Sequence, residues 1–414
     1  MRLHRTGVTA PRGFRAAGVS AGIKRSGRLD LAAIVSDREG SAAGVFTTNV
    51  VRAAPVQLGI ERLDRGGTGI RGIVAVSGVA NALTGPAGVD AMRRAVAATE
   101  RGLGLPAGSV LPACTGVIGP PLPVDRVEAA LPALAEALRA DPHGGDRAAQ
   151  AILTTDTQPK LARARATLAD GRTVTVGGIA KGSGMIAPRL GPPHATTLAF
   201  LTTDAPAAPR GLGRLLSHAA DATLGMVSVD GDTSTNDTVY LVANGAAGGP
   251  PAEGDPAFAR AVRSVLESLA RAIARDGEGA TKLLTVTIDG ARSRAEARAA
   301  ARAVVGSTLV KAAIFGADPN VGRIACALGY SGARLDPDRL DVHLDGPARP
   351  VPLIVDGRPA PGLDNGAGAR LRALLRRLDE VPIRVSLHQG RSSARAWGCD
   401  LSYSYVQINA AYRT

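Results

Sequence analysis

The sequence of 414 residues is poor in aromatic residues, lysine and cysteine. It has one tryptophan, five tyrosines and five phenylalanines, so the aromatic side chains on which single-stranded bases stack are scarce. No apolar run approaches the ~18 residues of a membrane-spanning helix, and the first residues lead into no apolar signal core. The three cysteines are far apart and form no CxxC motif. We therefore expect a cytoplasmic protein without a disulfide framework.

The positive charge of the chain is almost entirely arginine. Lysine and arginine number 49 against 36 acidic residues, which gives a net charge of +13. The arginines are scattered along expected helices, a pattern typical of solvated faces, and we expect neither nucleic acid nor membrane as a partner. Each of the five lysines is then a candidate for a role that needs a compact ammonium. Lys181, Lys282 and Lys311 lie among glycines or small residues.

The hydrophobic pattern predicts short strands and separate helices. Strands are expected at residues 72–77, 173–176, 198–203, 284–288, 340–344 and 383–387. One helix is expected to begin at Pro256 after an N-cap at Asp255, and another after Ser293, with Glu296 completing a capping box. Strands that look antiparallel, with helices apart from them, indicate the α+β class.

Several common site motifs are absent from the sequence. There is no P-loop, no HExxH metal motif and no GxSxG nucleophile elbow. The segment 230–237, rich in aspartate, resembles a calcium loop but lacks the glycine at its sixth position and the glutamate at its twelfth, which favours a turn. We predict no metal and no cofactor.

A threonine in the middle of the chain offers a different chemistry. Thr196 follows the small residue Ala195 in a segment constrained by proline, where a hydroxyl can attack the preceding carbonyl. Such an N-to-O acyl shift, followed by hydrolysis, makes the threonine a new N-terminus. Its α-amino group, with a pKa near ~7.7–8.0, can act as general base for its own hydroxyl. The Ala-Thr pair alone favours an ordinary strand threonine.

Motifs along nearly the whole chain decide between a self-processing threonine and an ordinary strand threonine at position 196. They are 8–14 (VTAPRGF), 44–49 (GVFTTN), 113–119 (ACTGVIG), 153–157 (LTTDT), 229–237 (VDGDTSTND), 276–282 (DGEGATK), 315–320 (FGADPN), 396–403 (AWGCDLSY) and 408–414 (INAAYRT). In this order they resemble the family of arginine biosynthesis that acts as ornithine acetyltransferase and glutamate N-acetyltransferase.

The resemblance implies a fold, an activity and a maturation step. The fold is a layered αββα sandwich with a self-processing N-terminal-threonine site. Cleavage between Ala195 and Thr196 gives an α chain of residues 1–195 and a β chain of residues 196–414, usually assembled as α2β2. Thr196 takes acetyl from N-acetylornithine as an ester and passes it to glutamate by a ping-pong route. Acetyl-CoA stays open as a second acetyl donor.

The resemblance also assigns the site residues. The hydroxyl of Thr115 and the backbone N–H of Gly116 match the family's oxyanion hole. The residues that match the amino-acid pocket are Thr154, Lys181, Thr196, Glu278, Asn409 and Thr414. Lys181 suits a substrate carboxylate, and Glu278 suits either an ammonium or the orientation of the site. Cys114, beside the oxyanion hole, is interpreted as a small buried residue and not as a nucleophile.

Two segments depart from the family pattern. The chain between Lys181 and Thr196 is longer than usual, with Gly191 to His194 as the extra part, and the segment 77–85 differs at several positions. These departures keep open a specialised acyltransferase of secondary metabolism. Two further alternatives are an aminopeptidase or amidohydrolase of the same fold, in which water replaces glutamate, and a basic binding protein without catalysis.

Overall fold

A computed structural model of the protein describes residues 6–187, 197–346, 349–361, 363 and 366–411. These residues divide into two compact units. Unit 1 comprises residues up to 225 together with 232–269, and unit 2 comprises 226–231 together with the residues from 270 onward. The helix α6 (Pro256–Arg275) contributes residues to both units.

Unit 1 is built on a mixed sheet that β2 (Leu31–Phe46) crosses with 16 residues. The strand order is β4 (Val110–Val117), β3 (Ile70–Val79), β2, β9 (Thr238–Ala243), β7 (Leu198–Thr203), β6 (Thr173–Lys181) and β5 (Lys160–Thr167), and β1 (Phe14–Val19) pairs with β2. The pairs β3–β4 and β7–β9 are parallel, and the others are antiparallel. As a result, β7 lies between β6 and β9 within the sheet.

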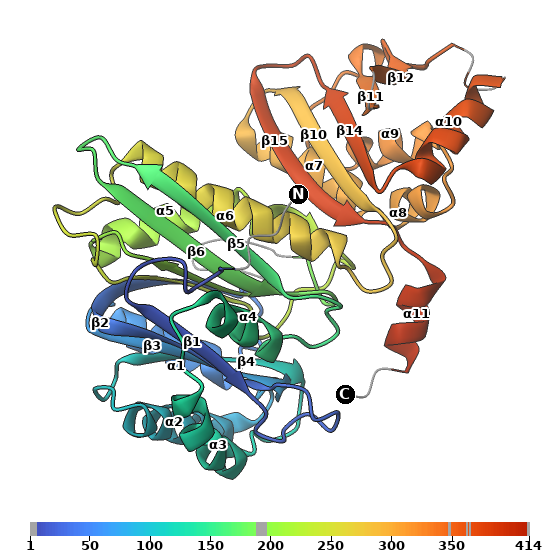
Figure 1. Ribbon diagram of the computed structural model, residues 1–414. Helices are drawn as coiled ribbons and strands as arrows, with labels where there is room; N and C mark the ends of the chain where they lie inside the picture. The colour runs from blue at the N-terminus through green and yellow to red at the C-terminus, as the bar shows by residue number, and fades with distance from the viewer. Residues whose placement is uncertain (1–5, 188–196, 347–348, 362, 364–365, 412–414) are drawn as a thin grey trace. The chain divides into compact units, whose positions relative to one another are not determined.

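Helices bury both faces of the β1–β4 part of this sheet. Figure 1 shows α2 (Gly85–Gly102) and α3 (Val124–Glu136) side by side, and they pack on the face of Leu31 and Val74. The alternate residues Ile34 and Ile73 face the helix α4 (Pro142–Ala151). Successive residues of a strand point to opposite faces of the sheet. Because both sets of alternate residues are apolar here, the sheet is buried on both faces. The remaining helices of unit 1 are α1 (Ala54–Asp64) and α5 (Pro209–Asp221).

Unit 2 has its own mixed sheet and its own helices. The strand order is β13 (Arg358–Pro359), β12 (Pro350–Val355), β11 (Asp341–Asp345), β14 (Glu380–Ser386), β10 (Leu283–Ala291), β15 (Ser392–Cys399) and β8 (Val227–Ser228). The helices are α7 (Arg294–Gly306), α8 (Thr308–Phe315), α9 (Val321–Gly329), α10 (Gly366–Arg377) and α11 (Tyr403–Ala410). Short 3-10 turns cover Leu224–Met226 and Pro337–Arg339.

The observed elements confirm the α+β class and most local predictions. The helix α6 begins at Pro256, where Asp255 Oδ1 accepts a hydrogen bond from the Ala257 N–H at 2.7 Å. The Ser293 side chain caps α7 by accepting from the Glu296 N–H at 3.1 Å. The expectation of antiparallel strands was incomplete, because β10 also pairs with β14 in parallel. Parallel partners are distant in sequence, so the pattern within one strand does not reveal them.

Candidate active site

The predicted oxyanion hole lies at the end of β4, where two glycines bring the chain close to β3. Gly116 pairs with Gly78, and both adopt a positive φ, of 133° and 106°. A Cβ atom on Gly116 would lie 2.3 Å from the carbonyl carbon of Gly78. No side chain fits there, so only glycine permits this strand geometry. Thr115 directly precedes it and is buried.

Lys181, the last residue of β6, reaches Thr115. Its Nζ donates a hydrogen bond to Thr115 Oγ1 at 3.3 Å, and its side chain is buried. At the same strand end, the Thr197 hydroxyl donates to the Lys181 carbonyl. Lys181 therefore lies between the predicted oxyanion hole and the residue that follows Thr196 in the chain.

Asp156 joins the Lys181 strand end to the loop of Thr154. Its Oδ1 accepts from Lys160 Nζ at 2.6 Å and from the Gly182 N–H at 2.7 Å, and its Oδ2 accepts from the Thr154 N–H at 3.2 Å. Burial alone raises the pKa of this carboxyl, but Lys160, Lys181 and these hydrogen bonds outweigh burial and hold the pKa well below its usual range. Asp156 is therefore a buried carboxylate held charged by lysines.

A third lysine and an arginine also hold this loop, through its backbone carbonyls. Lys24 Nζ donates to the carbonyls of Leu29 and Leu153, each at 2.7 Å, and Arg28 donates to the Thr154 carbonyl at 2.7 Å. Three of the five lysines, Lys24, Lys160 and Lys181, thus act electrostatically on Asp156 or bond to it.

We expect the free energy of unfolding to increase less steeply with pH in the Lys24→Met variant than in the wild type, at alkaline pH. Burial, with repulsion from Arg28, lowers the pKa of Lys24 from 10.5 to about 8, although Asp30 opposes the shift. Between about pH 8 and 10.5 the unfolded chain therefore binds more protons at Lys24 than the folded chain does. The free energy of unfolding then rises with pH in this window, through this one side chain.

Denaturant unfolding of both proteins between pH 7.5 and 10 checks this difference. Burial raises the pKa of the Cys114 thiol to about 12, which gives a contribution of opposite sign. Cys114 is present in both proteins, so the difference between the two pH slopes isolates Lys24. Identical slopes in the wild type and Lys24→Met would contradict the prediction.

The turn before β9 binds the backbone next to the predicted oxyanion hole and carries a carboxyl with an unusual pKa. Asn236 is buried and donates to the carbonyls of Ala80 and Cys114, at 2.6 and 2.9 Å. The neighbouring Asp237 is buried too, and within the described part of the chain its Oδ2 has no hydrogen-bond partner. Burial raises its pKa well above the usual range, against the influence of Ser234 and Lys181.

Unit 2 contains a second pair of predicted site residues. Asn409 on α11 donates through Nδ2 to Glu278 Oε2 at 2.8 Å. Glu278 is buried. The turn that contains it lies very close to α11, because a Cβ on the next residue, Gly279, would lie 2.5 Å from the Tyr405 nitrogen. The structure thus brings together two residues 131 positions apart.

The structure groups the predicted residues into these two sets. In unit 1 it brings together Thr115, Gly116, Thr154 and Lys181, and in unit 2 Glu278 and Asn409. Ala195, Thr196, Thr414 and the extra part from Gly191 to His194 lie outside the described residues.

Sequence reasoning missed Asp156 and Asn236. The segments of both were recognised only as motifs. One signal was available for Asp156. It lies four positions before Lys160, and lysine is rare in this chain, so an ion pair between the two could have been predicted. No pattern near Asn236 indicates its partners, because Cys114 is 122 residues away.

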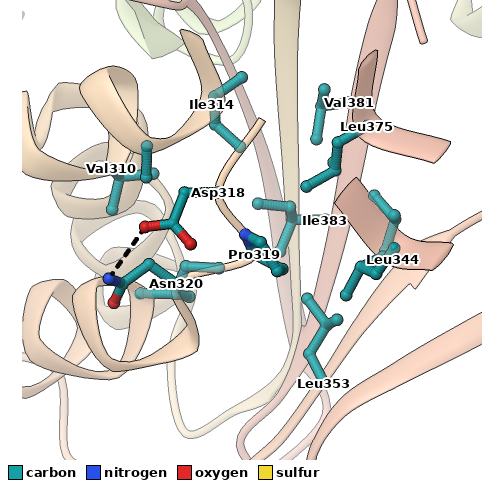
Figure 2. A pocket seen from close by; sticks show the side chains of 13 residues that line it. Val310, Ile314, Asp318, Pro319, Asn320, Leu344, Leu353, Leu375, Val381 and Ile383 are labelled. Carbon is teal, nitrogen blue, oxygen red and sulfur yellow. Dashed lines mark hydrogen bonds between the residues drawn. The ribbon is translucent and has the colours of Figure 1, made fainter. Parts of the chain in front are cut away.

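Unit 2 also holds a pocket that is lined by none of the predicted site residues. Figure 2 shows aliphatic side chains from α8, α10, β11 and β14 around the turn between α8 and α9. At this turn Asn320 Nδ2 donates to Asp318 Oδ2 at 3.3 Å. The space between atoms amounts to about 370 Å³, open solvent included. The aliphatic lining is what a packed core presents, and it offers little reactive chemistry.

Other chemistries find little support among the described residues. No group of three or more histidine, cysteine or acidic side chains there is arranged to hold a metal ion. The thiol of Cys114 is buried against the Met92 sulfur at 3.5 Å, and its raised pKa makes it a poor nucleophile. Within the same residues, no helix has the length and apolar character needed to cross a membrane.

Comparison with known proteins gives matches over nearly the whole chain. A model of the ArgJ family matches residues 15–414. The arginine biosynthesis bifunctional protein ArgJ of Symbiobacterium thermophilum is 50% identical, over 99% of this chain and 98% of that protein. The protein of the same name from Thermotoga neapolitana is 45% identical, over 98% and 99%. A crystal structure of the ornithine acetyltransferase of Mycobacterium tuberculosis with ornithine is 43% identical and covers 46% of this chain and 98% of that chain, with a TM-score of 0.42.

Proposed function

Because the chain belongs to the ArgJ family, we propose that it transfers an acetyl group from N-acetylornithine to glutamate in arginine biosynthesis. The observation that carries the proposal is the near-complete match to bifunctional ArgJ proteins. Transfer from one amide nitrogen to another is difficult in a single step. A covalent acetyl-enzyme divides it into two easier steps, each an attack on an acyl carbon.

Thr196 is the proposed nucleophile, freed by cleavage after Ala195. Its hydroxyl attacks the acetyl carbonyl of N-acetylornithine, while its α-amino group takes the hydroxyl proton and passes it to the leaving ornithine nitrogen. Glutamate then attacks the acetyl-Thr196 ester through its amino group, and the hydroxyl is regenerated. The described chain supports this placement, because Thr197, the residue after Thr196, donates a hydrogen bond to the Lys181 carbonyl at the end of β6.

Thr115 and Gly116 suit stabilisation of the tetrahedral intermediate. The Lys181 ammonium donates to Thr115 Oγ1, so it occupies a lone pair of that oxygen and leaves the hydroxyl hydrogen available to the oxyanion. The positive charge also strengthens the hydroxyl as a donor. The N–H of Gly116 is the second proposed donor, at a strand end whose geometry only glycine allows.

The remaining proposed pocket residues are suited to the charged groups of amino acids. Lys181 and the loop of Thr154 suit a carboxylate. The Glu278 carboxylate, held by Asn409, suits an ammonium such as the ornithine side chain carries. Thr414 completes the set. We further propose an α2β2 assembly of the chains 1–195 and 196–414, and a cytoplasmic location.

An exchange assay tests the proposal. The purified protein is incubated with N-acetylornithine and isotope-labelled ornithine, without glutamate. We expect label to enter N-acetylornithine, because an acetyl-enzyme can return its acetyl to either ornithine. Added glutamate should then yield N-acetylglutamate, followed by mass spectrometry.

Two outcomes separate this function from its alternatives. Release of acetate without N-acetylglutamate would indicate an amidohydrolase and overturn the proposal. Transfer only to other amines would indicate a specialised acyltransferase. A parallel incubation with acetyl-CoA and glutamate determines whether acetyl-CoA is a second donor.

A further inference from the structure

The carboxylate of Asp156 lies where two predicted parts of the pocket meet. It is fully buried and binds the Gly182 N–H, next to Lys181, through one oxygen. Through the other oxygen it binds the Thr154 N–H. One rigid group thus fixes the distance between the strand end of Lys181 and the loop of Thr154.

The same loop is also held through two of its backbone carbonyls. Lys24 donates to the carbonyl of Leu153 and Arg28 to that of Thr154, whereas Asp156 accepts from the Thr154 N–H. Asp156 alone among these groups contacts both segments. A shift of the loop relative to Lys181 is therefore resisted by the carboxylate.

We propose that Asp156 is a positioning residue for acyl transfer, which holds Lys181 and Thr154 in the geometry that the substrate needs. The inference rests on the proposed function. Asp156 is argued to act through Lys181, whose ammonium bonds to Thr115 in the oxyanion hole. A displacement of about 1 Å in such a group can reduce a rate by about 10²-fold.

The alternative is that Asp156 serves only as counter-ion for Lys160. The Lys160 side chain is 1% exposed and that of Asp156 is not exposed at all, at 2.6 Å between Nζ and Oδ1. Removing one partner of a buried ion pair leaves an unpaired charge and destabilises the fold, whereas neutral replacement of both is tolerated. The test therefore compares Lys160→Met with the double variant Asp156→Asn/Lys160→Met.

Both variants lack the ion pair, and they differ only in the carboxylate. Each is made in the full chain. The melting temperature is measured, then the rate of self-cleavage, then kcat and KM for acetyl transfer per cleaved molecule. We expect the double variant to fold, with kcat/KM about 10²-fold below that of Lys160→Met. Asp204→Asn is the matched control, because this buried aspartate also accepts from a backbone N–H, that of Thr175 at 2.7 Å, beyond the opposite end of β7.

The outcomes distinguish the positioning role from the proposed function. Equal cleavage and equal kcat/KM in Lys160→Met and the double variant would overturn the positioning role. A comparable loss of kcat/KM in Asp204→Asn would overturn it as well, since any buried aspartate would then have the same effect. If the wild type transfers no acetyl, the proposed function fails, and the positioning role that rests on it fails with it. If the wild type transfers acetyl and the two variants do not differ, only the positioning role fails.

Discussion

Thr196→Ala is expected to remain a single chain of 414 residues and to transfer no acetyl group. The wild type is expected to yield two chains of 195 and 414 − 195 = 219 residues. Alanine has no hydroxyl for the acyl shift, so neither the cut nor the acetyl ester can form. Activity should fall to the background of the assay. Intact-mass spectrometry of both preparations measures the cleavage, and the ornithine exchange assay measures the ester.

Thr196→Ser is the matched control for this prediction. Serine keeps a hydroxyl at the same position, so we expect cleavage and exchange to continue, at altered rates. A Thr196→Ala preparation that is cut after Ala195, or that exchanges labelled ornithine, would exclude Thr196 as the nucleophile. An active wild type that stays in one piece would exclude the self-processing mechanism altogether.

Gly116→Ala is expected to lower kcat by about 10²- to 10³-fold, the effect of losing one oxyanion donor. The added Cβ would lie 2.3 Å from the Gly78 carbonyl carbon and 2.6 Å from the Val79 nitrogen. Real Cβ atoms do not approach backbone so closely, so the ends of β3 and β4 must separate. Because the 116 N–H moves with that strand end, the oxyanion loses its donor.

Gly119→Ala separates this effect from backbone strain. Gly119 has a φ of 105° close to the same strand end, but nothing lies within 4 Å of its added Cβ. The control should lose stability through the disfavoured φ and keep kcat close to that of the wild type. Melting temperatures and steady-state kinetics of the two variants decide the matter. Equal kcat values in both would argue against Gly116 as an oxyanion donor.

The sequence predicts the local parts of this fold better than its connections. The start of α6 at Pro256 and the cap of α7 by Ser293 depend on neighbouring residues, and both were predicted correctly. The expected strand at 198–203 coincides with β7. The position of β7 in the sheet depends on β9, about 40 residues later, and no pattern within β7 encodes that partner.

The candidate site shows the same division. The resemblance supplied Thr115, Gly116 and Lys181, and the structure places the Lys181 ammonium on the Thr115 hydroxyl. Asp156 belongs to one of the motifs, but the sequence does not indicate its role, which requires the fold to bring Gly182 beside it. The role of a buried carboxylate depends on partners that the tertiary structure brings to it, so the sequence alone does not indicate that role.

The place of β7 between β6 and β9 has a consequence for reassembly. A cut before Thr196 assigns β6 to one chain and both β7 and β9 to the other, so the second chain inserts two strands between β6 and β2. The uncut chain folds by a unimolecular process. If the chain is cut as proposed and the two parts are separated by denaturant, the same sheet must form from two molecules. Its recovery is then second order in protein, and it slows with dilution.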